Sequence, residues 1–158
     1  MIRRLALVVA LAAAATGGWG VARWLAPAPS AAPAEARHIQ VWKSQSCGCC
    51  TAWIAYVEDA GYSVEIHDVE DVDPIKDQFG VPEELRSCHT ARLAGYVVEG
   101  HVPTAILDHL LNDRPAGVRG VAVPDMPPGA PGMDEDDSAY EVVTFGPAGT
   151  TSVQRQGG

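Results

Sequence analysis

The chain has 158 residues with 11 Lys and Arg against 20 Asp and Glu, which is a formal net charge of −9. This length is enough for one domain and little more. Beyond position 36 lie eight basic and nineteen acidic residues, a formal charge of −11. The acidic balance argues against nucleic acid or anionic lipid as a partner, and it does not oppose a cation as a ligand.

The first 25 residues have the pattern of a targeting segment. Arg3 and Arg4 precede an unbroken apolar run from Leu5 to Ala15, and small or apolar residues continue to Arg23. This pattern indicates a signal peptide or an uncleaved membrane anchor, since the apolar stretch approaches the length of a membrane span. We therefore expect export to a bacterial periplasm, with the protein either soluble or tethered to the inner membrane. An Ala/Pro-rich linker is expected over residues 26–37 and a single domain over 38–154.

The first half of this domain alternates strands and helices. An alternating apolar pattern predicts a strand over 38–43, and helical spacing of apolar residues predicts a helix from 53 to 60. A second strand is expected over 62–66. A short helix follows over 73–79, and 82–85 can form one more helical turn, with Pro82 in its first position.

The second half has weaker signals. A strand is expected within 91–99, a helix over 106–111 and a brief strand over 121–123, followed by a long loop over 125–137. Last strands are predicted over 141–145 and 150–153, with a frayed tail over 154–158. The order β-α-β-α-β-α-β-β predicts an α/β fold. Its opening favours a parallel crossover and, with the cysteine motif described next, a thioredoxin-like sandwich around a small mixed sheet.

Three of the four cysteines occur together in Cys47-Gly48-Cys49-Cys50, between the first predicted strand and helix. At a helix N-terminus, the helix dipole and unpaired backbone N–H groups lower thiol pKa values and favour thiolate. Cys47 and Cys50 have the Cys-x-x-Cys spacing of redox and metal sites, and Cys49 adds a third soft donor. The alternatives are a structural disulfide and buried cysteines that serve as small apolar residues.

The fourth cysteine stands in Ser87-Cys88-His89-Thr90, in the loop expected before the third strand. In a thioredoxin-like domain this loop faces the Cys-x-x-Cys turn. We therefore expect Cys88 and His89 to lie beside the other three thiols at one end of the sheet. The alternative is that Cys88 is an isolated buried thiol.

Softer or less certain donors occur elsewhere in the second half. Met126 and Met133 stand at the two ends of a loop rich in Pro and Gly, where they are either thioether ligands or gap-fillers of the core. His101 lies on a turn before Pro103 and is a candidate ligand, a donor to a ligand, or a surface residue. The other histidines are expected to be structural or solvated; they are His38, His67 and His109.

Thiolate, thioether and imidazole together favour copper(I) over hard cations. Zinc also binds cysteine and histidine but seldom uses thioether. Several clustered thiolates can bridge metal ions, so the sequence is compatible with more than one copper ion per chain. Two other readings remain open: a thiol–disulfide oxidoreductase in which Cys47 attacks and Cys50 resolves, and a structural zinc or disulfide module.

Four motifs occur together and in a recognisable order. They are Cys47-Gly48-Cys49-Cys50, Ser87-Cys88-His89-Thr90-Ala91, the segment 95–103 that contains Gly100-His101-Val102-Pro103, and the methionine loop 126–133. Together they resemble the CopG family of periplasmic copper-resistance proteins, long catalogued as a domain of unknown function. The resemblance spans residues 38–145. The chain departs from the family pattern at Asp125 and Ala130, where the family usually has glycine and serine.

The resemblance implies a thioredoxin-like fold and copper held in a thiolate-bridged cluster. It also implies a role in copper tolerance through the interconversion of Cu(I) and Cu(II), alongside other periplasmic copper-handling proteins. Carried over motif by motif, the implied metal-binding set is Cys47, Cys49, Cys50, Cys88, His89, His101, Met126 and Met133.

Overall fold

The computed structural model describes residues 34–133 and 136–157. The predicted signal or anchor segment and most of the predicted linker lie outside these residues. The end of the linker lies inside them, because Ala34–Arg37 forms the 3-10 helix η2, and Arg37 Nη1 contacts Asp108 Oδ1 at 2.7 Å. Within the described part of the chain, every helix is too short or too polar to cross a membrane.

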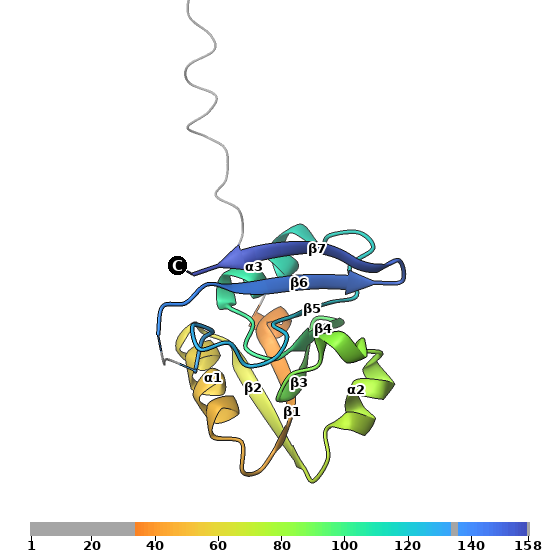
Figure 1. Ribbon diagram of the computed structural model, residues 1–158. Coiled ribbons are helices and arrows are strands. Elements are labelled where there is room, and N and C mark those ends of the chain that lie inside the picture. The colour runs from red at the N-terminus through yellow and green to blue at the C-terminus, as the bar shows by residue number, and fades with distance from the viewer. Residues whose placement is uncertain (1–33, 134–135, 158) are drawn as a thin grey trace, which may run out of the picture. The chain divides into compact units, whose positions relative to one another are not determined.

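The domain is built on one seven-stranded sheet with the strand order β2-β1-β3-β4-β5-β6-β7 (Figure 1). Neighbouring strands are parallel in β1/β2 and β4/β5 and antiparallel in the other pairs. The prediction of an α/β fold with a mixed sheet is therefore confirmed, and its thioredoxin-like form stays a prediction. The strands are β1 (His38–Ser44), β2 (Ser63–Val69), β3 (His89–Leu93), β4 (Tyr96–Glu99), β5 (Gly120–Ala122), β6 (Tyr140–Gly146) and β7 (Gly149–Gln156).

Helices cover both faces of this sheet. One face packs against α1 (Gly48–Asp59) and α3 (Thr104–Asp113), which contribute Trp53 and Leu107 to the larger apolar core. The other face carries α2 (Asp73–Phe79) and the 3-10 helix η3 (Glu83–Leu85), beside a smaller core that includes Phe145. Because side chains alternate along a strand, neighbours such as Val97 and Val98 enter different cores.

The third predicted strand is in fact a hairpin, and this corrects two expectations. The chain turns at Ala94 and Gly95, both with positive φ, so that β3 and β4 pair antiparallel. His89 and Thr90, expected in a loop, are therefore the first residues of β3, and only Cys88 lies in the bend before it. The element order accordingly becomes β-α-β-α-β-β-α-β-β-β. The sequence pattern missed β3 because Arg92 interrupts its apolar run and because one of its two partner strands, β1, is distant in sequence.

The predicted frayed tail is also wrong, because β7 continues to Gln156 and pairs with β6 along its length. Other boundaries agree with the predictions within a few residues. The segment from Asp125 to Met133 has no helix or strand, as expected. Helix α1 begins at Gly48, so that Cys47 caps it while Cys49 and Cys50 lie in its first turn, and this places the thiols at one end of the sheet.

Candidate metal centre

Residues 47–50, called the cysteine turn below, form the N-terminal cap of helix α1. Cys47 is the N-cap residue of α1, and its Sγ accepts a hydrogen bond from the backbone N–H of Cys50 at 3.3 Å. The Thr51 hydroxyl donates to the Cys47 carbonyl at 3.2 Å. Sulfur therefore occupies the place that an Asp or Ser oxygen takes in most caps. The preference for thiolate at this helix N-terminus stays a prediction.

Cys47 and Cys50 are joined as a disulfide, with their Cα atoms 5.4 Å apart. Cys49 remains a thiol, and its Sγ lies 3.6 Å from Cys47 Sγ. In this state Cys49 and Cys88 are the two described cysteines that keep a thiol. Thiolate from all four positions therefore requires reduction of the Cys47–Cys50 bond by two electrons.

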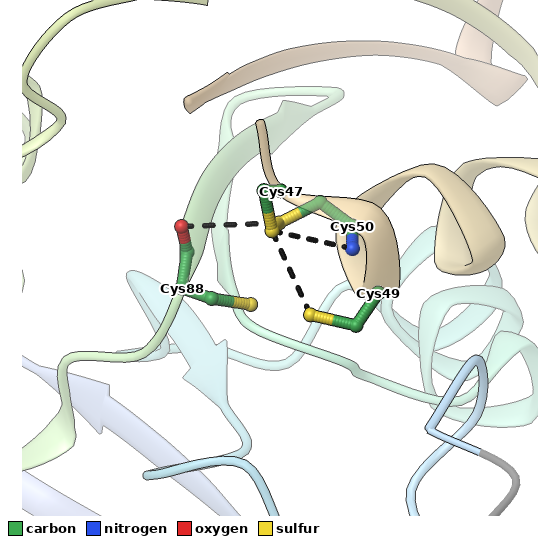
Figure 2. A group of neighbouring side chains, drawn as sticks. All are labelled: Cys47, Cys49, Cys50 and Cys88. Atoms are coloured by element: carbon green, nitrogen blue, oxygen red, sulfur yellow. Dashed lines mark hydrogen bonds between the residues drawn. A yellow bond between two sulfur atoms is a disulfide. The ribbon is translucent and has the colours of Figure 1, made fainter. Parts of the chain in front are cut away.

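The fourth cysteine lies across from this turn. Cys88 faces the start of α1 from the bend before β3 (Figure 2), and Cys50 Sγ lies 3.9 Å from the Cys88 carbonyl oxygen. The sulfur atoms of Cys47, Cys49, Cys50 and Cys88 all lie within 4.8 Å of one another. The prediction that residue 88 joins the other three thiols is confirmed, and the alternative of an isolated thiol is wrong.

Two buried imidazoles extend the group of donors around Cys88. Cys88 Sγ lies 3.1 Å from His101 Nε2 and 3.4 Å from His89 Nδ1, and both rings are fully buried. His101 Nδ1 lies 2.7 Å from the carbonyl oxygen of Pro131, which can only accept. Nδ1 must therefore carry a proton, and Nε2 is the ring nitrogen that faces Cys88. This arrangement is the one found in metal-binding histidines whose second nitrogen donates to a carbonyl.

Burial shifts the protonation of this group in two directions. Burial, and then the nearby Cys49, raises the pKa of the Cys88 thiol to about 12. Burial, followed by the charges of His101, Lys76 and Lys43, lowers the pKa of His89 well below its usual 6.5. His89 is thus neutral, as a metal ligand must be, whereas Cys88 must lose a proton to bind a metal ion.

Trp53 positions these histidines, a role that the sequence did not suggest. Its ring packs on His89 with 4.5 Å between ring centroids, and its indole N–H donates to the Val102 carbonyl at 2.9 Å, next to His101. Helical spacing identified Trp53 only as a core residue. His89 Nε2 is buried and finds no hydrogen-bond partner among the described residues, which is an unusual cost for a core histidine.

The methionine loop lies beside this centre through its middle and its end. Pro131 accepts the His101 hydrogen bond, and Gly132 (φ +79) packs so closely on the backbone of Trp53 that a Cβ would stand 2.6 Å from its nitrogen. Met133 is half-buried and packs against the larger core, whereas Met126 is 51% exposed. Ligation by the two thioethers stays a prediction.

The remaining histidines lie outside the centre, as expected. His38 and His67 each lie 3.4 Å from a different oxygen of Glu65 on the β1–β2 surface. His109 pairs with Asp113 on the exposed side of α3.

The donor set fits copper(I) on chemical grounds. Four sulfur atoms and two imidazoles are soft and borderline donors, and no carboxylate belongs to either of the two candidate metal-binding groups in the described residues. Such a set disfavours Mg²⁺ and Ca²⁺, which take oxygen ligands. The shared Cys88 links the four-sulfur group to the two histidines.

The Cys88 segment falls within a known family model. A family model described as "Protein of unknown function, DUF411" matches residues 85–133, a segment that includes Cys88, His89 and His101. No curated protein matches the sequence.

Two solved structures of copper resistance protein CopG are similar to the chain over most of its length. Form 1 has 40% sequence identity and a TM-score of 0.71, and it matches over 77% of this chain and 98% of the other. Form 2 has 39% identity and a TM-score of 0.70, over 75% and 97% of the respective chains. Sequence identity of 39–40% over nearly the whole of both solved chains places this chain in the CopG family.

Proposed function

We propose that the chain is an exported, periplasmic copper-binding protein that holds Cu(I) in a cluster of cysteine thiolates. The observation that carries this proposal is the convergence of Cys47, Cys49, Cys50 and Cys88, whose sulfur atoms lie within 4.8 Å of one another. Four thiolates at this spacing can bridge several Cu(I) ions. His89, His101 and the thioethers of Met126 and Met133 would complete the coordination.

The Cys47–Cys50 disulfide supports a further step, the interconversion of Cu(I) and Cu(II). Two thiolates that close this bond release two electrons, which is enough to reduce two Cu(II) ions to Cu(I). Export is supported by the basic and apolar pattern of the first 25 residues. In the periplasm the cargo would pass to or from other copper-handling proteins, and the acidic domain is suited to a cationic cargo.

The test is the copper content per chain, measured together with copper-edge X-ray absorption on protein purified without oxygen from copper-fed cells. We expect several Cu(I) ions per chain in a sulfur-rich shell. A matched sample of the Cys88→Ser variant should lose most of this copper. Protein that binds no copper after full reduction would contradict the proposal, and so would unchanged copper in the variant.

A second candidate function is thiol–disulfide exchange, favoured by the observed disulfide across Cys47 and Cys50 at a helix N-terminus. Cys47 would attack a substrate disulfide, and Cys50 would then resolve the mixed disulfide. Cys49 and Cys88 count against this function, since thiols this close to the pair divert it into other disulfides. Catalytic reduction of a disulfide substrate by the metal-free protein, abolished by Cys47→Ser, would favour this function over copper binding.

A further inference from the structure

A buried ion pair lies directly behind the Cys88 segment, on the sheet face opposite α1. Lys76 of α2 is 3% exposed and Glu99 at the end of β4 is fully buried, and Lys76 Nζ lies 2.6 Å from Glu99 Oε1. Desolvation of two such charges costs several kcal/mol each, by an order-of-magnitude estimate, so this pair contributes little net stability unless other hydrogen bonds add to it. The other hydrogen bonds of Glu99 and Lys76 show which segment the ion pair holds in place.

Glu99 accepts hydrogen bonds from the residues on both sides of the Cys88-His89 dipeptide. Its Oε1 accepts the backbone N–H of Ser87 at 2.6 Å, one residue before Cys88. Its Oε2 accepts the hydroxyl of Thr90 at 2.7 Å, one residue after His89. Lys76 Nζ also donates to the Thr90 hydroxyl at 3.0 Å. One carboxylate therefore brackets the two donor residues, and Lys76 holds that carboxylate in place.

The alternation of side chains along β3 connects these hydrogen bonds to the metal centre. His89 and Thr90 point to opposite faces of β3, so His89 packs on Trp53 while Thr90 faces Glu99, its partner across the β3/β4 ladder. The Gly100 N–H donates to the His89 carbonyl at 3.0 Å. Gly100 (φ +69) also allows Ser87 to approach closely, because a Cβ there would lie 2.6 Å from Ser87 Oγ.

We propose that Glu99 is the positioning residue of the metal centre: held by Lys76, it fixes Ser87 and Thr90 so that Cys88 and His89 face the cysteine turn. The part of this inference that concerns copper affinity rests on the proposed function. The part that concerns the position of Cys88 applies to the metal-free protein. The competing explanation is that the pair serves only the general stability of the fold.

The test compares two double variants that both lack the ion pair. Lys76→Met with Glu99→Gln keeps an amide oxygen that can accept from Ser87, whereas Lys76→Met with Glu99→Leu removes every acceptor at this position. Neither leaves an unpaired buried charge, which would itself be strongly destabilising. Arg37→Met is the stability control, because it breaks the ion pair with Asp108 outside the centre.

Two properties are measured beside the thermal unfolding temperature. The first is the rate of Cys88 alkylation by iodoacetamide in reduced, metal-free protein, followed by peptide mass spectrometry. The second is the Cu(I) affinity, measured by competition with a chromophoric chelator. We expect the Gln double variant to stay within about twofold of wild type. The Leu double variant should alkylate about tenfold faster and bind Cu(I) about 10- to 100-fold more weakly, as for other residues that orient metal ligands.

Equal alkylation rates and equal copper affinities in the two double variants would overturn the proposal. So would copper affinities that simply follow the unfolding temperature and fall as far in Arg37→Met. If the Leu variant does not fold, Thr90→Val decides: it removes one of the two bracketing contacts and should raise Cys88 alkylation about threefold. If wild type binds no copper, the proposed function fails, and the alkylation rates still test the role of Glu99.

Discussion

The two halves of the candidate metal centre are held in place in different ways. The cysteine turn is local: Cys47 caps the helix that carries Cys49 and Cys50, and a hydrogen bond between residues 47 and 50 closes the cap. The Cys88 half depends on distant parts of the chain, because α2, β4 and the methionine loop each contribute a contact to it. Changes to the first half should therefore act locally, whereas changes to many distant residues should disturb the second.

The strongest test of this comparison removes the donor that both halves share. Cys88→Ser deletes the thiolate that links the cysteine turn to the two histidines, so we expect Cu(I) affinity to fall more than about 100-fold, beyond the usual effect of an orienting residue. The measurement is a chelator competition at fixed pH. Ser46→Ala, on the same surface but without a sulfur, serves as the control and should leave affinity within about twofold. A similar loss in both variants would contradict a specific role for the Cys88 thiol.

A second variant separates ligation from the connection to the methionine loop. His101→Gln removes the Nε2 donor beside Cys88 and alters the hydrogen bond to Pro131, so a loss of about 10- to 100-fold in Cu(I) affinity is expected. His109→Gln is the matched control, because that imidazole pairs with Asp113 on the exposed side of α3, outside the centre. Equal affinities for the two variants would remove His101 from the centre.

The pH dependence of copper binding tests the protonation of Cys88. Its pKa is raised to about 12, so the metal-free protein keeps this proton throughout the neutral range, and binding must release it. Cu(I) affinity should therefore rise about tenfold per pH unit between pH 6 and 8 from this thiol alone. Calorimetric titrations in buffers of different ionisation enthalpy would count the protons. In Cys88→Ser one released proton should disappear, and an unchanged count would show that Cys88 does not bind.

The smallest effects are expected at the methionine loop. Met126 is exposed, so Met126→Leu should change unfolding free energy by less than about 0.5 kcal/mol. Met133 packs on the core, and Met133→Leu should cost less than about 1.5 kcal/mol. If the thioethers bind copper, each variant should weaken Cu(I) affinity about threefold. If Cu(I) affinity is unchanged in both variants and stability changes only in Met133→Leu, the loop packs on the core and does not bind copper.

The sequence identifies the candidate donors of the site but not the residues that position them. All four cysteines, His89 and His101 could be selected as donors from residue type and spacing, and the structure brings them together. Glu99, Lys76 and Thr90 were not selected, although a carboxylate directly after Tyr96-Val97-Val98 in a buried strand was a usable signal. Trp53 was identified as core, and its contact with His89 could not be anticipated because it joins a helix to a strand that the sequence pattern missed.

The sequence by itself determined the α/β class, the strand-to-helix cysteine turn and the soft character of the donors. These depend on periodicity, on helix-capping chemistry and on residue type, which act within a few neighbouring positions. Tertiary structure decided the β3–β4 hairpin, the extent of β7, the proton position on His101 and the hydrogen bonds of Glu99 to Ser87 and Thr90. The strand limits depend on backbone pairing between neighbouring strands, and the other two features depend on hydrogen bonds between separate segments. Neither can be read from the residue pattern of a single segment.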